Sequence, residues 1–544
     1  ITGQINMEYR KPTDEKPLFL NASVMNDTKT DFNVASSLQM GEKWSTVLLG
    51  HVSGNFRTFD HNHDGFMDDP EMFQVNVANR WLYYGPTGVQ VRFGLRGLQD
   101  MRKGGQSGYD HKKYTLSSTS PWGSDIVNRQ LNTYVKVGVP ISADNAKNIA
   151  FVADYTLTDM NLRAGASKYL ATQNSGFFNV LFQDEINDSH KFTLALGGTA
   201  DWFSEDFMRK VAAQKLDPGK TSKAFYNAGV SGEYTFHAGE KFSSILGFRG
   251  DWFNGEGFKA VPRLTLKYSP LEQIVLRANG GRGLRRALPV IDNIGVLSTG
   301  KAFAGVYSDH LLEDAWTFGG NATFYLPFGA SDDTYLSFDY FGTRFAEQMV
   351  VDYEHGLNTI DFYALGGKRS YSNNYQVDFN VEAFRRFTVS ATFRYTDAKV
   401  ELEGRGLVER PMTSRYKGVL NLQYATNLNK WIFDFTASVN GKSRVYEFMK
   451  GLRGEDGELL YKDGYTPVYP LLYLQVTKRF KGVDLYLGAE NLTNFRQKNL
   501  VIGTAIEGMS GHVDASRPDF DASAVWGPIM GTKFYLGARF TLWK

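Results

Sequence analysis

The sequence predicts an all-β fold: a transmembrane antiparallel up-and-down β-barrel of about 22 strands, with short periplasmic turns and long extracellular loops. Three observations support this fold class. Apolar and polar residues alternate from one end of the chain to the other, the alternating segments are long, and short and long connections follow one another in turn. A soluble sandwich also alternates, but its strands are usually only about 5–6 residues long.

The alternation is clearest in the second half of the chain. Every second residue is apolar or aromatic in three segments, 375–382, 433–440 and 483–490, and most residues between them are polar. Such segments extend to about ten or more residues, which is what a tilted strand needs to cross the hydrocarbon core. We therefore expect one face of each strand to contact lipid and the other to line a polar lumen.

The connections between the predicted strands fall into two classes. Tight turns rich in Gly, Asn, Asp, Ser and Pro are predicted at 41–43, 85–88, 187–189, 238–240, 269–271 and 481–482. Long polar loops are predicted at 58–71, 99–127, 204–222, 284–311, 346–371, 445–467 and 492–532. Short turns on one rim and long loops on the other are typical of an outer-membrane barrel. This alternation of connection lengths is not expected in a β-sandwich or a β-propeller.

The composition agrees with a barrel and excludes other classes. The chain has 29 Tyr, 40 Phe, 9 Trp and 55 Gly, which suits interfacial aromatic girdles and tight turns. Its net charge of +2 lacks the concentrated basic excess of a nucleic-acid-binding protein. No apolar run approaches the roughly 20 residues of a transmembrane helix. The mean hydropathy of −0.34 does not contradict a membrane barrel, because half of the strand residues face a polar lumen.

Several stretches resemble landmarks of TonB-dependent outer-membrane transporters, in the same order. They are the end of the plug domain (1–12), a glycine-and-arginine stretch before a long mid-barrel loop (280–285), the penultimate strand (488–494), and the last loop and last strand (526–529 and 534–542). The resemblance implies two parts: residues 1–12 as the end of the plug and entry strand, and residues 13–544 as the transmembrane barrel. The rest of the plug, which TonB pulls in this family, is expected to be absent from this chain.

The same resemblance implies a function and its partners. It predicts energised import of a scarce chelated nutrient, such as a ferric siderophore or cobalamin, across the outer membrane of a Gram-negative cell. The implied partners are the TonB complex acting through the plug, the metal chelate, outer-membrane lipid and a surface-exposed lipoprotein, with no nucleic acid. The alternatives are a passive pore or assembly scaffold, and then haem or glycan uptake. Haem transporters of the family have a ligand histidine in the interval where His310 lies, but here the following motif is replaced by residues 311–314.

No enzyme is predicted. The chain has no G-x-S-x-G, no H-E-x-x-H and no phosphate-binding glycine loop before a helix. Paired carboxylates are plentiful, but the lumen of a barrel is polar in any case.

Residues 60–71 match the D-x-[DN]-x-[DN]-G-x₅-E pattern of a calcium-binding loop. In such a loop Gly65 permits the sharp turn, and the oxygen ligands predicted for Ca²⁺ come from Asp60, Asn62, Asp64, the carbonyl of Phe66, Asp68 and bidentate Glu71. The alternative is an acidic solvated loop. His61 and His63 are expected to be ordinary loop residues rather than ligands of a transition metal.

Three arginines precede the loop at 284–311. Arg282, Arg285 and Arg286 are candidate ligand-binding residues, because guanidinium groups suit the oxygens of an anionic chelate. The alternative is that they pair with carboxylates of the lumen or of the plug. The loop aromatics could stack on a flat ligand or pack within the loops: Tyr109, Tyr114, Trp122, Phe303 and Tyr307.

Overall fold

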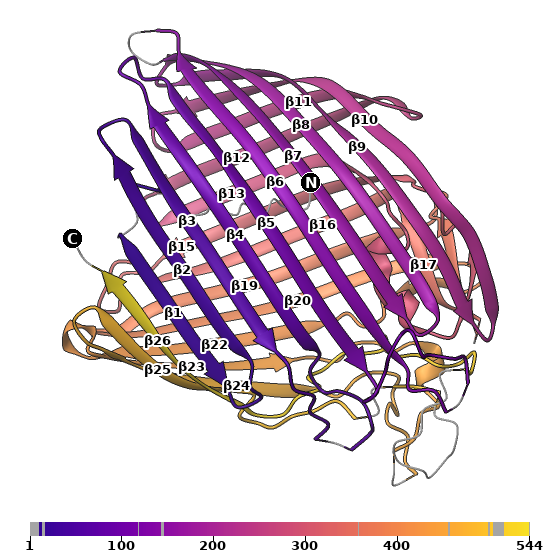
Figure 1. Cartoon of the computed structure of the whole chain (residues 1–544). Coiled ribbons are helices and arrows are strands. Elements are labelled where there is room, and N and C mark those ends of the chain that lie inside the picture. The colour runs from indigo at the N-terminus through magenta and orange to yellow at the C-terminus, as the bar shows by residue number, and fades with distance from the viewer. Residues whose placement is uncertain are drawn as a thin grey trace.

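A computed structural model describes residues 10–13, 17–61, 63–117, 119–142, 146–356, 358–454, 457–498, 501–503 and 516–542. Within these residues, twenty-two strands close into one antiparallel barrel (Figure 1). Consecutive strands pair with each other, and the first strand pairs with the last, from Leu18↔Leu542 to Met25↔Tyr535. The predicted fold class and strand number are confirmed.

The first half of the barrel contains the longest strands. They are β1 (Leu18–Met25), β2 (Thr30–Met40), β3 (Trp44–Asn55), β4 (Glu71–Tyr84), β5 (Gln90–Gly105), β6 (Gly123–Pro140), β7 (Lys147–Ala164), β8 (Ser167–Asn187), β9 (His190–Val211), β10 (Gln214–Ala238) and β11 (Phe242–Phe253).

The second half completes the wall. Its strands are β12 (Gly257–Leu271), β13 (Ile274–Arg286), β15 (Leu312–Tyr325), β16 (Tyr335–Glu347), β19 (Ser370–Phe384), β20 (Phe387–Leu402), β22 (Tyr416–Ala425), β23 (Trp431–Asn440), β24 (Tyr469–Arg479), β25 (Val483–Glu490) and β26 (Lys533–Leu542). The short β21 (Gly406–Glu409) pairs antiparallel with the end of β20, and η2 (Asn427–Asn429) forms part of a turn.

The period of two divides each wall strand into an outer and an inner face. On the outer face of β9, Leu194 and Leu196 are 51% and 53% exposed, which fits contact with lipid. On the inner face, the Asn227 amide donates to Asp251 (3.1 Å) and Arg249 pairs with the same carboxylate. The predicted polar lumen is therefore present, and its polar groups are hydrogen-bonded both within a strand and between neighbouring strands.

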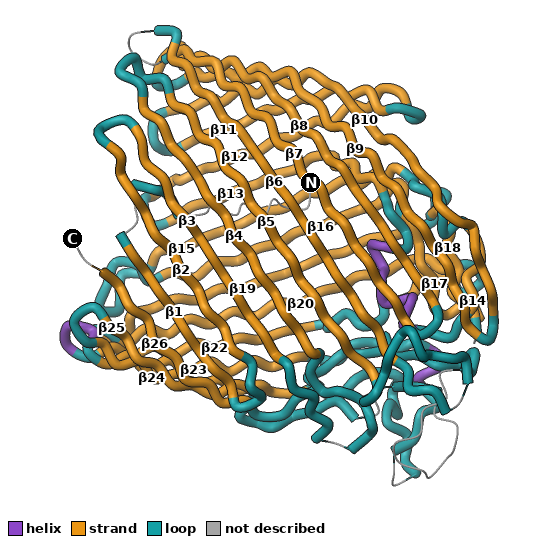
Figure 2. The backbone as a smooth tube through the Cα atoms, viewed as in Figure 1, coloured by secondary structure: helices purple, strands orange, loops and turns teal. Residues whose placement is uncertain are grey.

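Short and long connections are sorted between the two rims, as Figure 2 shows for the loops in teal. The tight turns predicted at 41–43, 187–189 and 481–482 join strands at one rim. One predicted loop is wrong: residues 204–222 continue β9 and β10 as a long hairpin, in register from Ser204↔Ser222 to Val211↔Gln214 with one bulge. The polarity of this segment suggested a loop, but a strand that has left the bilayer no longer needs an apolar outer face.

The long-loop rim is not open. The β13–β15 connection contains η1 (Ile291–Ser298) and β14 (Ala302–Gly305), and the β16–β19 connection contains β17 (Met349–Gly356) and β18 (Thr359–Ala364). β14 pairs in parallel with β18, and β17 pairs antiparallel with β18, so two loops share one small sheet. We call residues 287–311 and 348–369 the cap. A further connection, 441–468, contains η3 (Glu447–Met449).

Candidate ligand site under the cap

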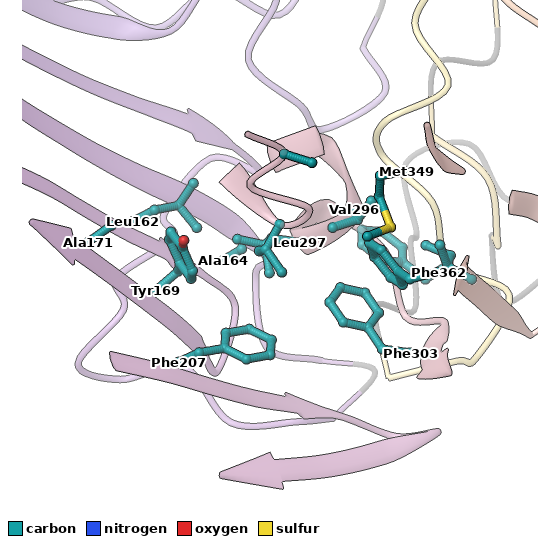
Figure 3. Packing of buried hydrophobic residues seen from close by; sticks show 14 of the residues in the cluster. Leu162, Ala164, Tyr169, Ala171, Phe207, Val296, Leu297, Phe303, Met349 and Phe362 are labelled. Carbon is teal, nitrogen blue, oxygen red and sulfur yellow. The ribbon is translucent and has the colours of Figure 1, made fainter. Parts of the chain in front are cut away.

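The cap is attached to the barrel wall by an apolar core. Figure 3 shows Val296, Leu297, Phe303, Met349 and Phe362 of the cap gathered opposite the wall. The wall contributes residues of β7, β8 and β9, and all of them are buried: Leu162, Ala164, Tyr169, Ala171, Phe203 and Phe207. Burying one large apolar side chain stabilises a structure by about 1.5–3 kcal/mol, so a core of this size holds the cap in one position.

Arg209, near the end of β9, ties the cap to the wall by hydrogen bonds. Its side chain is fully buried and donates to the carbonyls of Thr299 (2.9 Å), Lys301 (2.6 Å) and Val296 (3.4 Å). Its guanidinium carbon lies 4.1 Å from the centre of the Phe303 ring. Among the described residues no carboxylate lies within ion-pair distance of it, and burial lowers the pKa of Arg209 to about 9. Backbone carbonyls, the Thr299 hydroxyl (3.2 Å) and the Phe303 ring thus stabilise the positive charge.

Two further buried charges join the cap to the last loop of the chain. The Lys301 ammonium lies 3.9 Å from the centre of the Phe448 ring, and the side chain is fully buried. One oxygen of the buried Asp521 accepts from the backbone and hydroxyl of Ser523 (2.8 and 2.7 Å). Burial lowers the pKa of Lys301 and raises that of Asp521, and the attraction between the two charges opposes both shifts. Three loops therefore meet at one set of buried charges.

Between the cap and the barrel wall lies a cavity of about 870 Å³, which is in the range of small-molecule sites. The wall lines it mainly with neutral polar residues of β13, β15, β19 and β20: Asn279, Thr317, Ser370, Ser372, Asn374 and Thr396. The cap contributes Met349, Val351 and Tyr353, and the neighbouring loops contribute Met412 and Tyr446. The cavity therefore has a polar side and an aromatic, sulfur-containing side.

A short stack of aromatic rings forms that second side. The rings of Tyr353 and Tyr446 are 5.1 Å apart at 28°, and those of Tyr446 and Phe448 are 5.4 Å apart at 8°. Burial raises the pKa of both tyrosines, so their phenols stay neutral at physiological pH. They can stack on a flat ligand or donate a hydrogen bond to it.

Of the four charged residues that line the cavity, Glu354 and Lys399 are ion-paired, and Asp352 accepts hydrogen bonds from the backbone of Glu354 (2.8 Å) and the hydroxyl of Tyr363 (3.2 Å). Glu354, whose side chain is 1% exposed, lies 3.3 Å from Arg405 and accepts a second ion pair from Arg444. Arg410 differs, because no carboxylate in the described part of the chain lies within ion-pair distance of its exposed side chain. Arg410 lies close enough to Tyr446 to oppose the rise in its pKa. The cavity thus offers one uncompensated positive charge beside two aromatic rings.

The three predicted ligand-binding arginines are each held by carboxylates. Arg282 forms two parallel bonds with Asp314 (2.9 and 2.6 Å). Arg285, on the opposite face of β13, pairs with Glu313 (2.9 Å) and Asp292 (3.0 Å). Arg286 pairs with Glu256 (3.0 Å) and donates to the carbonyl of His310 (2.9 Å). Each of the three guanidinium groups is thus paired with a carboxylate of the barrel or of the cap, and their binding of ligand stays a prediction.

The predicted calcium loop is folded by its own carboxylates. Asp60 accepts from the backbone of Asp64 (3.1 Å) and Gly65 (2.9 Å), and Asp64 accepts from that of Phe66 (2.8 Å). Asn62 lies outside the described residues.

Its other predicted ligands have different partners. Asp68 is buried and accepts from the ring of His61 (3.0 Å), and Glu71, the first residue of β4, lies 3.8 Å from Lys103. Among the described residues no group of three or more His, Cys, Asp or Glu is placed to hold a metal ion. Calcium binding remains a prediction of the pattern.

His310 and the predicted loop aromatics are buried or pack against buried residues. His310 is buried between Phe203 and Phe225, and its Nδ1 accepts from Lys223 (3.1 Å). Burial and the Lys223 charge lower the pKa of His310 to about 4. Tyr109, Trp122 and Phe303 are buried, and Tyr114 and Tyr307 pack against the core, so these rings pack within the loops.

Sequence reasoning missed Tyr353, Arg410, Tyr446 and the anchor Arg209. They come from four separate loops and strands, so no local spacing links them. One signal was available: apolar residues alternate in 349–353 and 360–364, which indicates strands inside the predicted loop at 346–371.

No family model and no curated protein matches this sequence. Solved structures that resemble it include three siderophore receptors. PirA, a siderophore receptor of Pseudomonas aeruginosa, has a TM-score of 0.62 and 11% identity over 96% of this chain and 80% of that chain. A variant of the ferric enterobactin receptor PfeA from Pseudomonas aeruginosa, in complex with enterobactin, has a TM-score of 0.67 and 12% identity over 97% and 81%. PiuA, a siderophore receptor of Acinetobacter baumannii, has a TM-score of 0.66 and 12% identity over 96% and 81%.

At these identities the likeness is one of fold. It extends over almost the whole chain. This chain therefore has the fold of the siderophore-receptor barrels of the outer membrane.

Proposed function

We propose that this protein is an outer-membrane importer of an anionic metal chelate of the ferric siderophore class, driven by TonB. The observation that carries the proposal is the cavity under the cap, where Arg410 lies beside Tyr353 and Tyr446. The resemblance of the fold to PfeA with enterobactin and to other siderophore receptors supports it. An energised importer is proposed rather than an enzyme, because the resembling structures are receptors.

The groups of the cavity suit the parts of such a chelate. Arg410 would form charge-assisted hydrogen bonds with the oxygens of an anionic chelate. The rings of Tyr353 and Tyr446 would stack on its planar groups, and the neutral polar wall would pair with its amide and hydroxyl groups. Because the core of the cap is already folded, the loops need little further ordering when the ligand binds.

Passage through the barrel requires the ligand to leave this cavity towards the periplasm. The polar inner face of the wall offers hydrogen-bonding groups along that path. The outer membrane has no energy source of its own, so we propose that TonB supplies the work, with a plug as the part it acts upon. A surface-exposed lipoprotein remains a proposed partner at the extracellular rim.

Equilibrium binding to the purified protein tests the proposal. The ligands are ferric enterobactin, a ferric hydroxamate, cobalamin and haem, each measured with the wild type, Arg410→Gln and Tyr446→Leu. Loss of a hydrogen bond to a charged group costs about 1.5–3 kcal/mol, so Arg410→Gln should weaken binding of the anionic chelate about 10- to 100-fold. Lys462→Gln removes an exposed positive charge outside the cavity and is the matched control.

The other outcomes each favour a different function. If cobalamin binds with the same affinity to the wild type and to Arg410→Gln, cobalamin is the cargo, and the proposal of an anionic chelate is contradicted. If no ligand binds and the protein conducts ions steadily in a planar bilayer, the passive pore or scaffold takes its place.

A further inference from the structure

β10 forms an uncovered sheet edge above the β11–β12 hairpin. It is 25 residues long and pairs with β9 from Gln214 to Phe236, but it pairs with β11 only from Asn227 to Ala238. Figure 1 shows β10 continuing along the right edge of the view to the rim of long loops. We call residues 219–224, which lie beyond the ladder with β11, the free edge.

Backbone groups of the free edge point away from β9. Asn254, in the β11–β12 turn, donates from its backbone to the carbonyl of Tyr226 (3.0 Å) and from its side-chain amide to the carbonyl of Ala224 (2.8 Å). Because the direction of these groups alternates along a strand, the N–H and C=O groups of Ser222 and Lys220 point to the same side. Among the described residues no backbone hydrogen bond reaches these two residues from that side. The free edge thus offers their ladder groups to another strand.

The free edge lies outside the membrane. Tyr226 and Trp252 are 49% and 50% exposed on the outer faces of β10 and β11, and such aromatic residues mark the membrane interface. With a rise of about 3.4 Å per residue and a tilt of about 40°, Lys220 lies roughly 15 Å above Tyr226. Lys220, Ser222 and Ala224 are all exposed. A protein segment outside the cell can therefore reach this edge.

An uncovered edge is a hazard that proteins normally block, because it can pair with a strand of another chain. Higher on β10, Pro218 and the bulge between Leu216 and Gly219 block the edge. Residues 219–224 contain no proline and continue in regular register with β9. This part of β10 is therefore open to pairing.

The charge of the free edge selects the kind of strand. Among the described residues no carboxylate lies within ion-pair distance of Lys220, and Asp206, opposite it on β9, is paired with Lys168 (3.1 Å). Lys223 is exposed and donates to the carbonyl of Ser308 (3.0 Å). Opposite charges on neighbouring strands attract, so acidic side chains on an incoming strand are favoured. Two copies of this chain in one membrane would hold the edge at the same height, and the like charges of Lys220 would repel.

We propose that the free edge of β10 binds an extended acidic segment of another protein as an added strand. In this mode of recognition main-chain hydrogen bonds supply affinity, and the side chains beside them supply specificity. The site is separate from the cavity under the cap, because no residue of β10 lines that cavity. The inference requires the β9–β10 hairpin to stand outside the membrane, but it does not depend on the cargo.

The test titrates the purified protein with a fluorescent peptide of about seven residues in which glutamate alternates with valine or threonine. One control peptide has lysine in place of glutamate, and another has methylated backbone nitrogens that can no longer donate. Ser222→Pro removes a donor of the free edge but none of the ladder with β9, so it should weaken binding of the acidic peptide about tenfold. Ser222→Ala, which keeps the donor, is the matched control and should bind as the wild type does.

Two further measurements locate the bound peptide. Lys220→Glu should weaken binding of the acidic peptide about fivefold and strengthen binding of the lysine peptide. Hydrogen exchange should become slower at the amides of Lys220 and Ser222 when the acidic peptide binds. Binding of the metal chelate should be the same in all three variants, so failure of this proposal is distinguishable from failure of the proposed function.

Three results would overturn the proposal. They are no saturable binding of the acidic peptide to the wild type, equal affinity of Ser222→Pro and Ser222→Ala, and equal affinity for the peptide with methylated nitrogens. A dimer of the wild type that Ser222→Pro dissociates would also overturn it, because the edge would then bind a second copy of this chain. Heat-modified mobility on gels reports whether Ser222→Pro has folded. If it has not, the methylated peptide tests the same hydrogen bonds on the wild type.

Discussion

The barrel wall and the cap are held together in different ways. A wall strand such as β9 needs only alternation, and its partners are the next strands in the chain. The cap depends on contacts between residues far apart in sequence, such as Phe207 with Phe303 and Arg209 with the carbonyl of Lys301. A repeating pattern of alternation therefore builds the barrel wall, whereas single buried side chains position the candidate ligand site inside it.

The largest expected effect is on the cap core. Phe362→Ala should destabilise the cap by about 3–5 kcal/mol, because it leaves a cavity among fully buried rings. Hydrogen exchange should become faster in β14, β17 and β18 and stay slow in the wall. Val47→Ala, at a fully buried position of β3, is the control in the wall. Uniform loss of protection would contradict the separation of wall and cap.

The next effect concerns the buried arginine. Arg209→Gln should destabilise the cap by about 2–4 kcal/mol, because it leaves buried carbonyls without donors. Proteolysis at the loops should become faster, and so should permeation of small solutes through the barrel. Lys210→Gln, the neighbouring outward residue, is the control. If both variants resist protease equally, Arg209 is not an anchor.

A pH effect of similar or smaller size is expected at His310. Its pKa falls from 6.5 to about 4 on folding, so the neutral ring contributes about 3 kcal/mol above pH 6.5. This contribution is lost as the pH falls from 6.5 through 4, since the unfolded state then binds the proton more readily. The cap should therefore loosen in acid before the wall does. Lys223, Asp309, Arg286 and Asp292 act on the same ring.

His310→Gln should abolish this acid-induced loosening, as measured by hydrogen exchange between pH 7 and pH 4. His51→Gln in β3, where the ring lies 2.7 Å from Asn33, controls for the loss of an imidazole from the wall. Acid loosening that persists in His310→Gln would assign it to another group.

The smallest expected effect is at the predicted calcium loop. Calcium should bind with a Kd on the order of 10⁻⁴–10⁻³ M, and Glu71→Gln should abolish binding, as measured by isothermal titration. Glu42→Gln, at an exposed turn of the other rim, should leave it unchanged. Equal calcium affinity in Glu71→Gln and wild type would mean that the loop is ordered by its own carboxylates alone.

Only part of the candidate site could be predicted from the sequence. Arg282, Arg285 and Arg286 were found because they lie together in the sequence, but pairing with Asp314, Glu313 and Glu256 depends on neighbouring strands. Tyr353 and Tyr446 were missed because only the fold brings their rings to 5.1 Å. In the same way, the polarity of 204–222 could not distinguish a loop from strands that rise above a bilayer.

The sequence by itself determined the barrel: its class, its strand number, its alternation and the sorting of its connections. These features depend on alternation with a period of two and on turn residues, and both signals lie within short stretches of sequence. Closure of the barrel follows because an open sheet edge would leave backbone groups without hydrogen bonds in the membrane. The tertiary structure alone decided that the long loops form a cap, that Arg209 is buried against carbonyls, and that Arg410 is left beside two tyrosines. Those outcomes depend on contacts between side chains that lie far apart in the sequence. The local pattern does not distinguish among such contacts, and burial and desolvation determine which of them form.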